Sequence, residues 1–142
     1  EIRSGIDAWL RESGVPDIVL FSSPGGNDDL TSIAYESVLD NINAIVDAIQ
    51  AINPEATIII EQAAPPMTSE QTSEFLAVYN QIIQDVVTIA ERQSTTTSKV
   101  MTVDMATGFT DAMLADDVHY NEAGARFIAT RYFEVLQNIL RE

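Results

Sequence analysis

The sequence predicts an α/β protein in which helices alternate with the strands of a parallel sheet. Short runs rich in β-forming residues are separated by long stretches whose apolar residues recur every three or four positions. Strands joined through helices require crossover connections, which give parallel pairing. The 142 residues, 46% of them hydrophobic, suffice for one domain with a buried core, and no linker or repeat divides the chain. We therefore expect a single domain over residues 1–142.

The first half of the chain contains a helix, a strand and a second helix. Apolar residues on one helical face open the chain, and Gly14 ends this helix. Residues 17–22 form a compact apolar run, which is typical of a strand covered on both faces. After the polar loop 23–29, residues 32–52 have the spacing of an amphipathic helix, and Pro54 follows its end.

The second half repeats this alternation. Residues 57–60, with the sequence TIII, predict the second strand, and a helix is expected to begin near Ser69. Residues 99–104 predict the third strand, and a loop over 105–118 leads to the last helix, expected over 121–140. In such a sheet, functional groups gather in the loops that leave the carboxyl ends of the strands.

The loop after the third strand contains the only histidine of the chain. His119 follows Asp116 by three residues in a tight turn before the last helix. A carboxylate at this spacing can accept a hydrogen bond from the ring Nδ1–H, which fixes the tautomer and stabilises the imidazolium. The alternative is that Asp116 or Asp117 only supports the start of the helix and that His119 is an ordinary surface histidine.

The loop after the first strand combines glycine with an amide side chain. Gly25 and Gly26 permit backbone angles that other residues avoid, so the Asn27 amide could point over the strand end as a donor to an oxyanion. The alternative is a common turn in which Asn27 or Asp28 caps the following helix.

Taken together, the two loops resemble the third and fifth sequence blocks of the SGNH (GDSL-like) esterases. Residues 16–30, PDIVLFSSPGGNDDL, are similar to the third block, with Gly25, Asn27 and Asp28 matching. Residues 116–129, DDVHYNEAGARFIA, resemble the fifth block. Softer matches elsewhere resemble the acetylxylan- and carbohydrate-esterase-like branch, so the resemblance covers nearly the whole chain.

The resemblance implies a flavodoxin-like, three-layer α/β/α sandwich and a serine esterase that cleaves an ester or O-acetyl group on a small acyl or carbohydrate substrate. Within it, His119 is the expected base, Asp116 its orienter and Asn27 the oxyanion donor. Gly25 and Gly26 are expected to line the substrate site. No cofactor or metal is expected, and a non-catalytic binding module of the same fold is the alternative.

One part of the family pattern is missing, because the first block, Gly-Asp-Ser, and the second-block glycine are absent. Only 26 residues precede Asn27, so the chain resembles the C-terminal two thirds of the domain. We expect an N-terminal segment outside this sequence to supply the nucleophile; Ser22, Ser23 and Ser4 are weaker candidates. The missing strand would leave residues 17–22 with a bare edge and an uncovered face, which predicts a second polypeptide or self-association.

Composition excludes several other functions. A net charge of −15 repels nucleic acid, and the absence of cysteine excludes a thiolate metal site or a cysteine nucleophile. The aspartates between Asp104 and Asp117 lack the ligand spacing of an EF-hand and are expected to form a solvated acidic rim. No apolar run is long enough to span a membrane, and no signal peptide is visible in the sequence. We expect a secreted or periplasmic protein.

Overall fold

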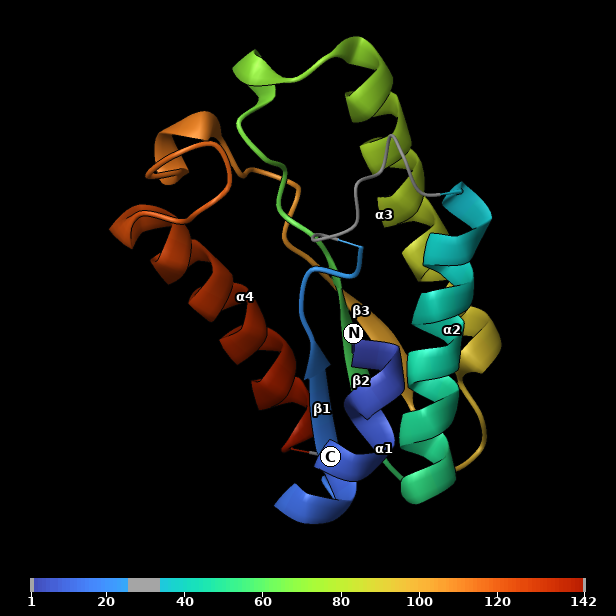
Figure 1. The fold of residues 1–142 in the computed structure, drawn as a ribbon. Coiled ribbons are helices and arrows are strands. Elements are labelled where there is room, and N and C mark those ends of the chain that lie inside the picture. The colour runs from blue at the N-terminus through green and yellow to red at the C-terminus, as the bar shows by residue number, and fades with distance from the viewer. Residues whose placement is uncertain (1, 26–33, 142) are drawn as a thin grey trace.

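A computed structural model describes residues 2–25 and 34–141 of the chain. Helices and strands alternate along these ranges as the sequence predicts (Figure 1). Their bounds in chain order are α1 (Ile2–Ser13), β1 (Ile18–Phe21), α2 (Tyr35–Ile52), β2 (Thr57–Gln62), α3 (Ser73–Gln93), β3 (Val100–Asp104) and α4 (Glu122–Ile139), with 3₁₀ turns η1 (Thr68–Glu70) and η2 (Asp111–Met113).

The three strands form a parallel sheet in the order β1-β2-β3. Leu20 lies opposite Ile59, and Ile60 lies opposite Thr102. Within β2, the residues Ile58, Ile59 and Ile60 are fully buried, since this central strand is covered on both faces by helices and on both edges by strands. Its β-branched side chains suit such a position, as expected of a buried parallel strand.

The helices lie on both faces of the sheet, which confirms the predicted α/β/α sandwich. Figure 1 shows α4 on one side of the strands and α2 and α3 on the other. One apolar cluster joins α1, α2 and α3 to the sheet around Val46, Ile58 and Val86. A second cluster joins α4 to the opposite face around Ile59 and Val103. None of the helices in the described ranges has the length and hydrophobicity needed to cross a bilayer.

Two expected boundaries are wrong, and both differences bear on the site. The second strand continues past Ile60 to Gln62, which places Glu61 inside the sheet instead of in the loop after it. The third helix begins at Ser73 and not near Ser69, because the hydroxyl of Thr72 caps it by accepting the backbone N–H of Phe75.

Strand β1 lies at an edge of the described sheet, where β2 is its one partner. Leu20, in the middle of β1, is 44% exposed, so the face that it shares with α4 is incompletely covered. The expected bare edge and open face of residues 17–22 are therefore present in the described part of the chain.

Candidate active site

The loops that leave the carboxyl ends of the strands meet at one end of the sheet. Met67, after β2, donates its backbone N–H to the carbonyl of Asp117 over 2.8 Å. The carboxylate of Asp111 accepts the backbone N–H groups of Thr68 and Ser69. These bonds join the loop after β2 to the loop after β3 and hold the histidine turn beside the sheet.

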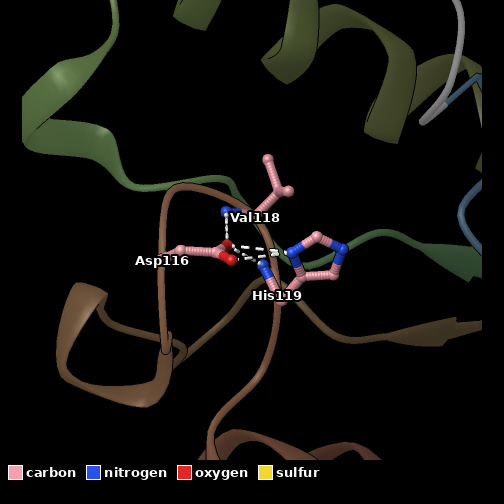
Figure 2. A network of polar contacts seen from close by, with 3 residues as sticks. All are labelled: Asp116, Val118 and His119. Atoms are coloured by element: carbon pink, nitrogen blue, oxygen red, sulfur yellow. Dashed lines mark hydrogen bonds and ion pairs between the residues drawn. The ribbon is translucent and has the colours of Figure 1, made fainter.

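Asp116 and His119 are in direct contact in this turn, as the sequence predicts. The ring Nδ1 of His119 lies 2.8 Å from Oδ2 and 3.0 Å from Oδ1 of Asp116. Figure 2 shows that the same carboxylate also accepts the backbone N–H groups of Val118 and His119. Both side chains are open to solvent, with 79% of the His119 side chain and 56% of the Asp116 side chain exposed.

The environment of Asp116 keeps its carboxylate ionised. The backbone N–H groups of Val118 and His119, and after them the ring of His119, lower the pKa of Asp116 to about 2. An ionised carboxylate can only accept, so it selects the tautomer of His119 that carries its proton on Nδ1. In the neutral ring, Nε2 is then an unprotonated acceptor, which is the state that a general base requires.

The start of α4 holds this turn in place. The side-chain oxygen of Asn121 accepts the backbone N–H groups of Ala123 and Gly124, and its Nδ2 donates to the carbonyls of Ala112 and Leu114. One amide therefore caps α4 and ties the helix to η2. A Cβ atom at Gly124 would lie 2.2 Å from the carbonyl oxygen of Met113, so this close approach requires glycine.

The loop after β1 is described as far as Gly25. Gly26 and Asn27 lie outside the described residues, so the expected oxyanion donor stays a prediction. Ser23 has a φ of +44° and Gly25 a φ of +79°, so the chain turns sharply on leaving β1. The hydroxyls of Ser22 and Ser23 and the backbone N–H of Ser23 all lie within hydrogen-bonding distance of Oε2 of Glu61.

Glu61 is the polar residue of this region that sequence reasoning missed. It is 1% exposed, and its Oε1 accepts the hydroxyl of Tyr132 in α4 over 2.6 Å. The signal in the sequence was an acidic residue directly after the apolar run TIII, where a buried parallel strand would normally continue apolar.

An apolar pocket of about 180 Å³ lies between these loops and α3. Gly25 lines this pocket, and so do Val118 and Tyr120, the residues on either side of His119 in the sequence. The other lining residues are Ser23, Pro24, Ala63, Ala64, Pro65, Pro66, Phe75, Tyr79, Ile82 and Ile83.

Three aspartates between β3 and α4, namely Asp104, Asp111 and Asp116, accept backbone N–H groups. Asp104 accepts the backbone N–H groups of Ala106 and Thr107, and Asp111 and Asp116 accept backbone N–H groups as described above. Across residues 2–25 and 34–141, no group of three or more acidic or histidine side chains is arranged to hold a metal ion.

Comparison with solved structures identifies the fold. A carbohydrate esterase family 3 from Talaromyces cellulolyticus superposes with a TM-score of 0.85 and 25% identity, over 99% of this chain and 66% of that chain. A family 3 carbohydrate esterase from Clostridium thermocellum gives a TM-score of 0.75 and 25% identity, over 99% of this chain and 65% of that chain. The chain has the SGNH-hydrolase fold.

A third structure with this SGNH-hydrolase fold is a serine-to-alanine mutant of an acetyl esterase with an acetate ion. Its TM-score is 0.84 and its identity 24%, over 99% of this chain and 66% of that chain. The present chain therefore spans just under two thirds of the length of these structures. No protein-family model matches the sequence, and neither does any curated protein.

Proposed function

We propose that the chain forms the histidine-bearing part of a serine esterase, with His119 as general base and Asp116 as its orienter. The contact between the Asp116 carboxylate and Nδ1 of His119 carries this proposal. It combines an ionised acceptor, a fixed tautomer and an exposed Nε2 on an SGNH-hydrolase fold. A purely structural aspartate at the helix start would need only the backbone N–H groups of Val118 and His119.

The proposed reaction has two halves. A serine hydroxyl attacks the ester carbonyl while Nε2 of His119 takes the hydroxyl proton, and the side-chain amide of Asn27 donates to the oxyanion. Collapse of this intermediate expels the alcohol, which receives the proton from His119. Water, activated by His119, then attacks the acyl-enzyme and releases the acid and the free serine. The reaction requires no metal or organic cofactor.

We propose that the nucleophile belongs to a serine-bearing segment, defined here as an N-terminal segment with Gly-Asp-Ser that lies outside this sequence. Two observations support it: the chain spans 66% of the length of the acetyl esterase, and that enzyme was altered at a serine. The hydroxyls of Ser22 and Ser23 are directed to Glu61 instead. The open edge of β1 offers a place where that segment, or a second copy of the chain, could pair.

An acyl ester, or an acetylated carbohydrate, is the substrate class that we propose. The names of the similar structures, carbohydrate esterase and acetyl esterase, support this class. The apolar pocket, with Gly25, Val118 and Tyr120 among its lining residues, offers room for a small acyl group. Action outside the cytoplasm is part of the same proposal and rests on the carbohydrate substrate class.

Covalent labelling tests the proposal. The 142-residue chain, alone and together with the serine-bearing segment, is treated with a fluorophosphonate probe, in wild type and in His119→Ala. We expect labelling only when the segment is present and His119 is intact. Labelling of the chain alone would contradict the missing nucleophile and make Ser22 and Ser23 the residues to replace. Absence of labelling in a folded assembly would favour a binding module instead.

A further inference from the structure

We propose that Glu61 is a positioning residue for the loop that follows β1, because its buried carboxylate holds the turn at Ser22 and Ser23 from which that loop leaves the sheet. The loop contains Asn27, so the catalytic consequence of this role rests on the proposed function. The hydrogen-bonding role of Glu61 itself stands on the fold alone.

The carboxylate is buried where β1, β2 and α4 meet. Glu61 is the fifth residue of β2 and, by strand alternation, shares the α4 face of the sheet with Ile59. Its Oε2 accepts the backbone N–H of Ser23 over 2.7 Å and the hydroxyl of Ser22 over 3.0 Å. Its Oε1 accepts the hydroxyl of Tyr132 over 2.6 Å. One side chain thus joins the end of β1 to α4.

The turn that Glu61 holds has an unfavourable backbone conformation. Ser23 has a φ of +44° and is the one non-glycine residue with a positive φ in the described ranges. A residue with a Cβ atom avoids this region, so the conformation persists only where the surroundings impose it. The N–H that donates to Oε2 belongs to Ser23 itself, so this hydrogen bond acts directly on the residue with the unfavourable backbone conformation.

The carboxylate accepts hydrogen bonds at both of its oxygens, which an amide cannot do. Donors reach Glu61 at both oxygens, with Ser22 and Ser23 at Oε2 and Tyr132 at Oε1. A glutamine has one acceptor oxygen, so its NH₂ group would either face the backbone N–H of Ser23, which cannot accept, or force the Tyr132 hydroxyl to accept instead of donate. Burial and the contact with Glu61 raise the pKa of Tyr132 well above its usual range, so the phenol remains a donor.

Hydrogen exchange of the Ser23 amide, followed by NMR in the 142-residue chain, tests the proposal. Ser23 is exposed, yet we expect its amide in wild type to exchange at least about tenfold more slowly than an open amide, because it donates to Glu61. Exchange of the Ser23 amide at the open-chain rate in wild type would overturn the proposal. This measurement needs no variant, so the proposal can be tested even if Glu61→Gln does not fold.

Glu61→Gln is compared with Tyr132→Phe, which removes a donor to the same carboxylate but leaves Oε2 and its partners. We expect Glu61→Gln to accelerate exchange at Ser23 about tenfold beyond any change at the core amide of Ile59, and to shift the resonances of Ser23 and Gly25. Tyr132→Phe should leave Ser23 protected. Equal acceleration at Ser23 and Ile59 would show loss of global stability alone and would overturn the positioning role.

Hydrolysis of an acetyl ester by the chain assembled with the serine-bearing segment is the functional measurement. We expect Glu61→Gln to lower kcat about tenfold with KM changed less than about threefold, since the loop serves the transition state. Ser23→Gly in that background should recover part of kcat, because glycine adopts a positive φ without strain. An unchanged kcat in Glu61→Gln would overturn the positioning role. Inactivity of the wild-type assembly would instead contradict the proposed function, and the exchange result on Glu61 would still stand.

Discussion

The carboxylate of Asp116 binds the ring of His119 and the backbone of the same residue, with the N–H of His119 2.8 Å from Oδ1 and Nδ1 2.8 Å from Oδ2. The hydrogen bond from the backbone N–H of His119 holds the Asp116 carboxylate in the position from which it contacts the ring. An exposed pair of side chains would otherwise lose conformational entropy to stay in contact. The turn therefore orients the imidazole in a site that is largely open to solvent.

The substitution Asp116→Asn should separate orientation from turn formation. The amide oxygen of the new side chain could still accept the N–H of His119, but its NH₂ group cannot accept the Nδ1–H, which favours the wrong tautomer. We expect kcat of the assembled esterase to fall by roughly 10³–10⁴. Asp117→Asn, which removes the same charge from the neighbouring exposed position, is the control and should retain activity. Similar losses in both variants would indicate a general charge effect.

The role of Asn27 can be tested with a variant of nearly the same shape. Asn27→Asp keeps the size of the side chain but replaces its N–H donor by a carboxylate oxygen, and Asn27→Ala removes the side chain. We expect Asn27→Ala to cost about 3 kcal/mol of transition-state stabilisation, and Asn27→Asp at least as much. The measurement is kcat/KM on an acetyl ester. Full activity in Asn27→Asp would rule out an oxyanion donor at this position.

Acid should weaken the contact between the two loops through Asp111. Hydrogen bonds from the backbone N–H groups of Thr68 and Ser69 lower the pKa of Asp111 from 3.8 to about 2. Because the unfolded chain binds this proton more readily, the stabilisation is present above the ordinary pKa and is lost as the pH falls through about 2.

We therefore expect the free energy of unfolding to decline between about pH 4 and pH 2 less steeply in Asp111→Asn than in wild type, as measured by urea denaturation. Carbon-13 NMR titration of the Asp111 carboxyl should have its midpoint at about 2. A midpoint at the ordinary value would contradict the bonds to Thr68 and Ser69.

Gly124→Ala should destabilise the protein although alanine favours helices. The gain in helix propensity is at most about 1 kcal/mol, whereas overpacking against a rigid group costs about 1–3 kcal/mol. The added Cβ would meet the backbone oxygen of Met113 at 2.2 Å, which no side-chain rotation relieves. We expect a net loss of about 1 kcal/mol or more in urea denaturation, with little change in the exposed control Ala125→Ser. A stabilised Gly124→Ala would contradict this close packing.

Interactions between residues close together in the chain were predictable from the sequence, whereas those between distant residues were not. The Asp116–His119 contact spans three residues within one turn, so its spacing was visible in the sequence. The buried strand around Ile59 was visible because three consecutive isoleucines, residues 58–60, form its centre. The partners of Glu61 lie 38, 39 and 71 residues away, at Ser23, Ser22 and Tyr132. No local sequence pattern predicts hydrogen bonds between residues so far apart.

The start of α3 was misplaced for a related reason. Asp111, which lies 43 residues after Thr68, binds the N–H of Thr68 and helps to hold a separate 3₁₀ turn over residues 68–70. The helix then begins after its own cap at Thr72. A tertiary hydrogen bond therefore decided a boundary that local propensity could not.

The central claim, that His119 is the general base of an esterase, is tested most directly by the rate of acetyl ester hydrolysis in wild type and His119→Ala, each assembled with the serine-bearing segment. The measurement is kcat at neutral pH, with circular dichroism to confirm that the two proteins fold alike. We predict that His119→Ala lowers kcat by about 10⁴ or more, because no other group at this position can take the serine proton. Equal rates in wild type and His119→Ala would contradict the account.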